Sequence, residues 1–437
     1  MTTHQDQDLK QYTQHSRSWF SRHKFATGFF ILVFGVIIGI CIRIAMVNRS
    51  NASFQAGIEA FYVPPATSPS SAAGALLKSE VMPGVVVPGG GTAYRVLYNT
   101  QLANGEAAVS SGVVYVPNTP APAGGRNVVA WAHGTQGFGD NCVPSRNPSG
   151  PLGDTDNWLG SMMQRGWVVT ATDYTGLGTP GEPYYLIGQS EAHDVINSVR
   201  AARNLPVASA GSRYVAWGHS QGGHSALFTA QLSKSYAPEL KLLAVAAAAP
   251  AAELNALFSL QYASSVAWGI GPDATVSWPL VYNLPLEGVL SKAALRNYKS
   301  IAYGCVKNEL AEIELRQGIG QRFFETDPNS NIQWYNAAKA QTPQVELAGV
   351  PIYVAQGLTD NIVLPPTTAL LVQNACSKNV NITTNWLGNT GHVQAAMVAG
   401  PAVTNWLADR FSGKLAVSNC DQPLPVAPAT LPAPPST

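Results

Sequence analysis

A serine between two glycines is the first place in this sequence where side chains have a spacing suited to nucleophilic chemistry. The motif is Gly218-His-Ser220-Gln-Gly222. A nucleophile on a sharp strand-to-helix turn needs small residues two positions before and after it, because the backbone is crowded there. Glycine makes up 40 of the 437 residues, so the spacing alone carries a risk of a chance match. The surroundings favour a nucleophile, because a strand-like run, Tyr214–Trp217, precedes the motif and an apolar helical segment follows it.

Such a serine needs a base to take its proton and an acid to orient the base. In folds that place a serine on this kind of turn, the acid and then the histidine follow it along the chain. Of the eight histidines, only His392 lies well downstream, just after a strand-like run. The intervening aspartates are Asp273, Asp327 and Asp360, and only Asp360 lies in a turn after a predicted sheet strand. The order therefore predicts a catalytic triad of Ser220, Asp360 and His392, with an unengaged loop histidine and a solvated carboxylate as the alternative interpretations.

Two backbone N–H groups are expected to stabilise the oxyanion that forms when the serine attacks. One is the amide of Gln221, the residue after the nucleophile, and the other should come from the loop after the third predicted strand. That loop contains His133-Gly-Thr135, so Thr135 or Gly134 is the expected second donor, and His133 is expected to hold the loop. An ordinary tight turn is the alternative interpretation of the His-Gly pair.

Strand-like and helical segments alternate along most of the chain after residue 92. This alternation predicts a mostly parallel central sheet with helices on both faces and with antiparallel strands at its N-terminal edge. Residues 93–250 and 347–420 are expected to form this core. The predicted strands are Ala93–Thr100, Ala107–Val116, Val128–Ala132, Trp167–Tyr174, Arg213–Trp217, Leu242–Pro250, Pro351–Gly357 and Asn381–Leu387, and the predicted helices include Asp156–Gln164, Ser190–Asn204 and Thr367–Cys376.

The segment from Ala251 to Glu346 interrupts the alternation and is rich in large apolar side chains. It is predicted to be a helical cap, inserted between two sheet strands, that lines an apolar substrate pocket beside the serine. The alternative is a structural subdomain whose aromatic residues fill their own core. The stretch after Cys420, residues 421–437, is rich in proline and is predicted to be disordered.

An uncharged apolar run from Phe25 to Ile42 marks residues 25–47 as one transmembrane helix or a signal segment. A buried helix would show a polar stripe, and this run shows none. Basic residues before it predict a cytoplasmic arm, residues 1–24, with everything after the segment exported. The length of the run favours an uncleaved single-pass anchor, and cleavage near Ala52 is the alternative. Residues 48–92, rich in Pro, Gly, Ser and Ala, are predicted to be linker and loops.

The composition excludes some classes of function and indicates the redox compartment in which the protein is found. The chain is 46% hydrophobic and 12% charged with a formal net charge of +1, which argues against nucleic-acid binding. It contains no phosphate-binding loop, HExxH motif or CxxC pair, so no metal or organic cofactor is expected. Cys41 lies in the apolar run, which leaves four cysteines in the exported part: Cys142, Cys305, Cys376 and Cys420. This even number predicts two disulfides in an oxidising compartment, with three possible pairings; buried free thiols are the alternative.

Several longer stretches resemble the secretory lipase family of α/β-hydrolases. The most specific is Asp173–Asn204, DYTGLGTPGEPYYLIGQSEAHDVINSVRAARN, and AHGTQG, GHSQGG, VPIYVAQGLTDNIVLPP and GH also occur in the family's order. The resemblance, from about Phe61 to Cys420, implies an α/β-hydrolase fold and an extracytoplasmic serine lipase or esterase. It also implies the disulfides Cys142–Cys305 and Cys376–Cys420. Two features depart from the family: the sequence Ala-His-Asp at 192–194, and an N-terminal anchor in a family known mainly as free secreted enzymes.

The leading hypothesis is hydrolysis of carboxylic esters of lipids or other apolar substrates through an acyl-enzyme on Ser220. A short-chain carboxylesterase or deacylase is the alternative among hydrolases. A non-catalytic α/β-hydrolase that serves as a surface binding protein is the alternative from another class. Such a relative would be expected to lack a triad member, and none is missing here. The expected partners are an ester or lipid substrate and, through the N-terminal segment, a membrane; no obligatory protein partner is implied.

Overall fold

The computed structural model describes residues 52–66, 72–147 and 155–435, together with Phe34, Ile38, Arg43, Met46 and Arg49. The predicted cytoplasmic arm lies outside the described residues, and so does the predicted membrane segment apart from four of these isolated positions. Across the described part of the chain, no helix combines the length and the apolar character that crossing a bilayer requires. The chain divides into two compact units, residues 1–59 and 60–437, and every candidate site residue belongs to the second.

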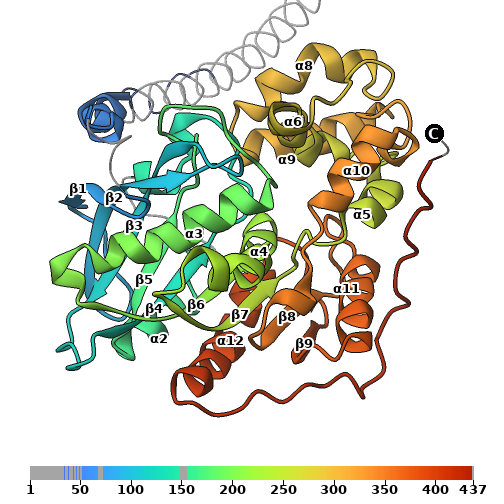
Figure 1. Cartoon of the computed structure of the whole chain (residues 1–437). Helices are drawn as coiled ribbons and strands as arrows, with labels where there is room; N and C mark the ends of the chain where they lie inside the picture. Colours follow the sequence, from blue (N-terminus) through green and yellow to red (C-terminus); the bar gives the residue numbers. More distant parts are fainter. Residues whose placement is uncertain are drawn as a thin grey trace, which may run out of the picture. The chain divides into compact units, whose positions relative to one another are not determined.

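The strands described in the second unit form one sheet in the order β1-β2-β3-β5-β4-β6-β7-β8-β9 (Figure 1). The pairs β1–β2, β2–β3 and β3–β5 are antiparallel. All pairs from β5–β4 to β8–β9 are parallel, which confirms the predicted mostly parallel sheet. The strands are β1 Leu76–Val81, β2 Gly91–Gln101, β3 Ala107–Pro117, β4 Arg126–Ala132, β5 Val168–Thr172, β6 Ala210–His219, β7 Lys241–Ala248, β8 Ile352–Gly357 and β9 Ile382–Leu387.

Alternate residues of the central strands pack on opposite faces of the sheet. In β4, Val128 and Ala130 belong to one apolar cluster, whereas Val129 and Trp131 belong to another. Residues of α3, α4 and α11 complete the first cluster, and residues of α2 and α12 complete the second. Because both faces are covered, the central strands are continuous apolar runs in the sequence. The helices are α2 Leu159–Gln164, α3 Gly188–Arg203, α4 Gln221–Tyr236, α11 Pro365–Ser377 and α12 Ala395–Phe411.

The connection between β7 and β8 consists mainly of helices, and we call its residues 251–346 the cap (yellow to orange in Figure 1). Its helices are α5 Leu254–Gln261, α6 Ala267–Ser277, α7 Pro279–Tyr282, α8 Lys292–Ala302, α9 Val306–Gly318 and α10 Ile332–Ala340. The start of α9 is joined to the loop after β4, because the Val306 amide donates to the Gln136 carbonyl oxygen at 2.8 Å. A disulfide between Cys142 and Cys305 strengthens the same connection.

The two ends of the second unit hold more structure than the sequence patterns indicate. A second disulfide joins Cys376 in α11 to Cys420. In the proline-rich stretch beyond it, the Ala429 amide donates to the Pro366 carbonyl oxygen at 2.8 Å. Near the other end, β1 lies inside the segment interpreted as linker. Within the same predicted linker, residues 52–62, most of which belong to the first unit, are helical. Because β1 is an edge strand with no fully buried residue, its sequence LLKSEV carries no alternation that would reveal it.

Candidate active site

Ser220 occupies a sharp turn, because no other residue separates the end of β6 from the start of α4. Its φ of 56° and ψ of −116° form a conformation that residues with a side chain rarely adopt. The glycines make this turn possible. A Cβ atom on Gly218 would lie 2.0 Å from the Gly222 carbonyl oxygen, and one on Gly222 would lie 1.8 Å from that of Ala132. Only glycine at both positions lets the strand and the helix approach this closely.

The structure brings Ser220, His392 and Asp360 into one chain of hydrogen bonds. His392 Nε2 lies 2.8 Å from Ser220 Oγ, and His392 Nδ1 lies 2.8 Å from Asp360 Oδ2. The amides of Ile362 and Val363 donate to Asp360 Oδ1 at 2.9 and 3.0 Å and hold the carboxylate. The three residues follow β6, β8 and β9, which end at the same edge of the parallel sheet. With its Nδ1 proton directed to Asp360, the imidazole presents Nε2 as an acceptor for the serine proton.

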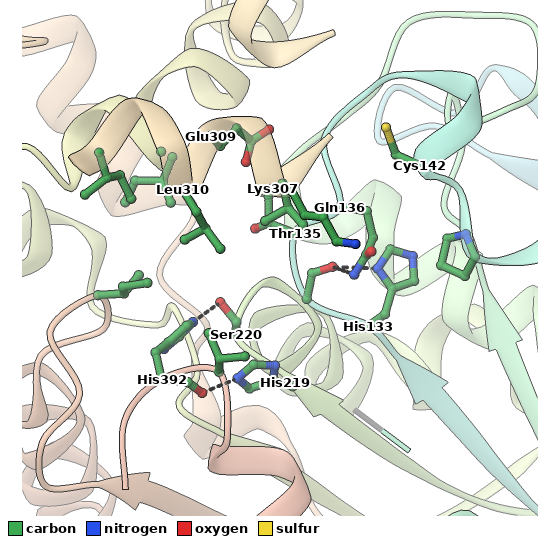
Figure 2. Close-up of a pocket in the computed structure, with 18 of the residues that line it drawn as sticks. His133, Thr135, Gln136, Cys142, His219, Ser220, Lys307, Glu309, Leu310 and His392 are labelled. Atoms are coloured by element: carbon green, nitrogen blue, oxygen red, sulfur yellow. Dashed lines mark hydrogen bonds between the residues drawn. The ribbon is translucent and has the colours of Figure 1, made fainter. Parts of the chain in front are cut away.

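His219 holds the backbone of the catalytic histidine candidate, a contact that the sequence analysis did not predict. Its Nε2 atom lies 2.9 Å from the His392 carbonyl oxygen and is placed to donate to it (Figure 2). The two imidazole rings lie 5.0 Å apart. The one signal in the sequence was the position of His219 inside the Gly-His-Ser motif, which says nothing about the loop that it contacts.

The loop after β4 lies beside the serine, where a second oxyanion donor is needed. A Cβ atom on Gly134 would lie 3.5 Å from the serine Cβ, and Thr135 lines the same pocket. The Tyr174 hydroxyl donates to the His133 carbonyl oxygen at 3.1 Å and so helps to hold the loop. Gln221, the other predicted donor, is the first residue of α4. The loop and the start of the helix, which contain the predicted donors, therefore both lie beside the serine.

A cavity of about 390 Å³ opens beside Ser220 and His392 (Figure 2). On its cap side, α9 contributes Leu310 and Ile313, and Ile270 comes from α6. Further lining residues are Trp131, His133, Gly134, Thr135, Gln136, Cys142, Pro144, Asn147, His219, Gly269, Val306, Lys307, Glu309, Ile362 and Val393. Apolar side chains of the cap on one side and the reactive Ser220 on the other suit a substrate with an apolar chain and a reactive polar group.

The two other aspartates between the serine and the histidine lie in the cap. Asp327 accepts hydrogen bonds from Ser259 Oγ at 2.6 Å and from the Asn329 amide at 2.9 Å, so it caps a short 3₁₀ turn. Asp273 lies in α6 and has no exposed surface. Within the part of the chain that the structure describes, no three metal-ligating side chains converge.

Asp273 in α6 and Glu309 in α9 form a pair of buried carboxyl groups. Among the described residues, neither carboxyl has a hydrogen-bond partner. Burial raises the pKa of Glu309 to about 8. Burial is also the main reason why the pKa of Asp273 lies well above its usual range, and the negative charge of a nearby ionised Glu309 raises it further. Glu309 also packs against the loop after β4, because a Cβ atom on Gly137 would lie 2.9 Å from its Oε1. Tyr185 is the other titratable group beside the pair, and burial raises its pKa as well.

This pair predicts that the protein loses stability as the pH rises from about 4 to about 8. Over that range the folded protein keeps a proton on Glu309 that the unfolded chain releases, so the free energy of unfolding falls with increasing pH. Each unit of raised pKa corresponds to about 1.4 kcal/mol, which gives a total of about 5 kcal/mol for the rise from 4.5 to about 8. Glu309→Gln should flatten this fall, and thermal unfolding from pH 4 to pH 9 measures it.

A matched control for this prediction is Glu314→Gln, which removes an exposed carboxyl from the same helix. It should leave the pH dependence of the melting temperature unchanged. The pair would have no such role if Glu309→Gln and wild type lost stability in parallel between pH 5 and pH 9.

Comparison with known proteins identifies the family to which the chain is similar. Residues 155–419 match the sequence profile of the family described as "Secretory lipase". A "Secreted triacylglycerol lipase" of Malassezia globosa is 25% identical over 410 residues, which cover 87% of this chain and 84% of that protein. A Mycobacterium tuberculosis protein described as a "Probable inactive lipase" is 23% identical and covers 81% of this chain and 82% of its own length.

Two solved structures have a similar fold. Candida antarctica lipase A in its closed state has a TM-score of 0.66 at 19% identity, over 84% of this chain and 89% of that one. The rice cell wall degrading esterase LipA from Xanthomonas oryzae has a TM-score of 0.63 at 18% identity, over 79% of this chain and 100% of that one. This likeness confirms the predicted α/β-hydrolase fold. The family match covers more than half of the chain, and the protein therefore belongs to the secretory lipase family and is a carboxylic ester hydrolase.

Proposed function

We propose that the protein hydrolyses carboxylic esters of lipids or other apolar substrates through an acyl-enzyme on Ser220. The observation that carries this proposal is the continuous hydrogen-bonded chain from Asp360 through His392 to Ser220, with 2.8 Å at both links. The strained turn that presents the serine, and the apolar cavity beside it, support the same function.

The reaction has two halves. His392 takes the proton from Ser220 as its Oγ attacks the ester carbonyl carbon, and Asp360 stabilises the imidazolium that forms. The amide of Gln221 and that of Thr135 or Gly134 donate to the oxyanion. His392 then gives its proton to the leaving alcohol, which leaves an acyl ester on the serine. Water, deprotonated by His392, attacks this ester and releases the carboxylic acid and the free serine.

The apolar cap wall favours an acyl chain over a small acetyl group, because Ile270, Leu310 and Ile313 bury apolar surface of the substrate. A series of p-nitrophenyl esters of increasing acyl length, assayed on the purified protein, tests this. We expect kcat/KM to rise from the acetate to esters of longer chains. A maximum at the acetate would favour the short-chain esterase. No turnover of any ester would favour a non-catalytic protein; the Mycobacterium tuberculosis relative is described as a "Probable inactive lipase".

The proposed place of action is outside the cytoplasm, as the name of the Malassezia globosa relative states for that protein. Two disulfides fit an oxidising compartment. The uncharged run from Phe25 to Ile42 supports an uncleaved anchor with the N-terminus in the cytoplasm. N-terminal sequencing of protein from the native host tests this. Full-length protein that resists a carbonate wash is expected, whereas a mature chain that begins at Ser53 in the medium would exclude the anchor.

A further inference from the structure

A buried carboxylate that contacts the residue after Ser220 accepts four hydrogen bonds. It belongs to Glu191, in the first turn of α3, and the residue is 1% exposed. Its Oε1 accepts from the Leu186 amide and from Gln221 Nε2, each at 2.8 Å. Its Oε2 accepts from His224 Nδ1 at 3.1 Å and from Ser225 Oγ at 2.7 Å. Since all four neighbours are placed to donate, the site is built for the ionised carboxylate.

His224 supplies the opposite charge. Its Nδ1 faces the Glu191 carboxylate, and its Nε2 lies 3.0 Å from the carbonyl oxygen of Gln341. A neutral imidazole carries one N–H, so the imidazolium is the form that can donate to acceptors on both sides of the ring. The His224 side chain is fully buried, where a cation needs a partner of opposite charge. Glu191 and His224 therefore form a buried ion pair with no net charge.

The same pair is linked to the cap. Gln341 follows α10, and its carbonyl oxygen receives the His224 hydrogen bond. Its side-chain Oε1 accepts from the Gly188 amide at 2.7 Å, and its Nε2 donates to the Tyr282 hydroxyl in α7. One cap residue thus joins the N-terminal ends of α3 and α4, which are the two helices that carry the ion pair.

We propose that Glu191 is a positioning residue for ester hydrolysis, which acts through Gln221 with His224 as its counterion. The inference rests on the proposed function, in which the Gln221 amide donates to the oxyanion. The hydrogen bond from Gln221 Nε2 to Glu191 ties the first residue of α4 to a group that three further hydrogen bonds hold. Oxyanion stabilisation depends on donors that are already in place, so a small displacement of this residue lowers the rate.

The positive charge of His224 offsets the negative charge of Glu191 near the oxyanion. A lone carboxylate beside the start of α4 would oppose the negative charge that develops on the substrate oxygen. Because the imidazolium neutralises it, the hydrogen bonds of Glu191 are available without this repulsion. The link from His224 to Gln341 further ties the oxyanion donor to the cap that covers the substrate pocket.

The test compares Glu191→Gln with wild type in steady-state hydrolysis of a p-nitrophenyl ester. Glutamine has one acceptor oxygen for two pairs of donors and carries no charge, so it cannot hold Gln221 and the His224 imidazolium together as the carboxylate does. We expect kcat to fall by about 10- to 100-fold with KM changed by less than about threefold, as for loss of a transition-state interaction. The affinity for a trifluoromethyl ketone, which mimics the tetrahedral intermediate, should fall by a similar factor.

The matched control is Asp194→Asn, which neutralises another buried carboxyl in the same helix, one that bonds to Thr175. It should keep kcat within about twofold of wild type, since burial already raises the pKa of Asp194 to about 7. His224→Gln provides a second variant if Glu191→Gln does not fold. It leaves the carboxylate uncompensated and should lower kcat by about tenfold at an almost unchanged KM.

The outcomes separate this inference from the proposed function. Normal kcat and normal ketone affinity in a folded Glu191→Gln or His224→Gln variant, even with a lowered melting temperature, would make the ion pair purely structural and overturn the inference. A wild-type protein without ester turnover would instead contradict the proposed function. A double variant that is no slower than the slower single variant is expected, because both changes disrupt one unit.

Discussion

Replacing Ser220 with alanine is expected to lower kcat for ester hydrolysis by about 10⁴-fold or more while the protein stays folded. The size follows from the reaction itself, because no acyl-enzyme forms without the hydroxyl oxygen that attacks the carbonyl. Alanine occupies the same strained turn with one atom fewer, so the fold loses little. Ester turnover and the melting temperature, measured on the same preparation, check the two halves of the prediction.

A fluorophosphonate probe adds a direct measurement. Wild-type protein should carry the phosphonyl group on the peptide that contains Ser220, and Ser220→Ala should carry none. The matched control is Ser235→Ala, an exposed serine at the other end of α4, which should retain both labelling and turnover. Near-normal esterase activity in Ser220→Ala would disprove the mechanism.

The second large effect is expected at the two other triad candidates. His392→Ala should slow hydrolysis about as much as the serine change, because members of a triad act as a unit. Asp360→Asn should lower kcat by about 10⁴-fold, since an amide N–H₂ facing Nδ1 favours the other histidine tautomer. That tautomer places a proton on Nε2, and Nε2 can then no longer accept the proton of Ser220. Steady-state kinetics of the purified variants above pH 7 measure both effects.

Asp327→Asn is the matched control for the acid, because this aspartate lies in the cap and caps a 3₁₀ turn. It should keep kcat within a few-fold of wild type. Asp273→Asn, which replaces a buried carboxyl whose pKa is already raised by burial, should likewise retain turnover. If either cap variant lost ester turnover while Asp360→Asn kept it, the assignment of Asp360 as the acid of the triad would be wrong.

Much of the core was predictable because its signals are local. Both faces of the parallel strands are buried, so runs such as Leu242–Pro250 are apolar throughout, and their alternation with helices indicates the sheet. The sharp turn at Ser220 was predictable for a related reason. The Gly218 and Gly222 positions are crowded by backbone of the turn itself and of the adjacent strand, so their side chains must be absent. Chain order then selected His392 and Asp360.

The edge strand and the C-terminal stretch have weaker signals in the amino-acid sequence than the core has. The edge strand β1 has no fully buried residue, so its sequence shows neither an apolar run nor an alternating pattern. The stretch after Cys420 has a composition typical of disorder, yet its path along α11 includes a hydrogen bond between the backbones of Ala429 and Pro366. Such contacts use backbone groups, which every residue carries, and composition does not encode them.

The amino-acid sequence by itself determined the residue types of the site, their order and the strand ends on which they lie, because burial makes the central strands continuous apolar runs and gives the helices between them a period of 3.6. Only the tertiary structure decided which distant side chains meet. It placed His219 on the carbonyl of His392, Glu191 against Gln221, and Glu309 beside Asp273. The physical reason is that these contacts depend on sheet order and on the packing of the cap, and both are set by the whole core rather than by any segment.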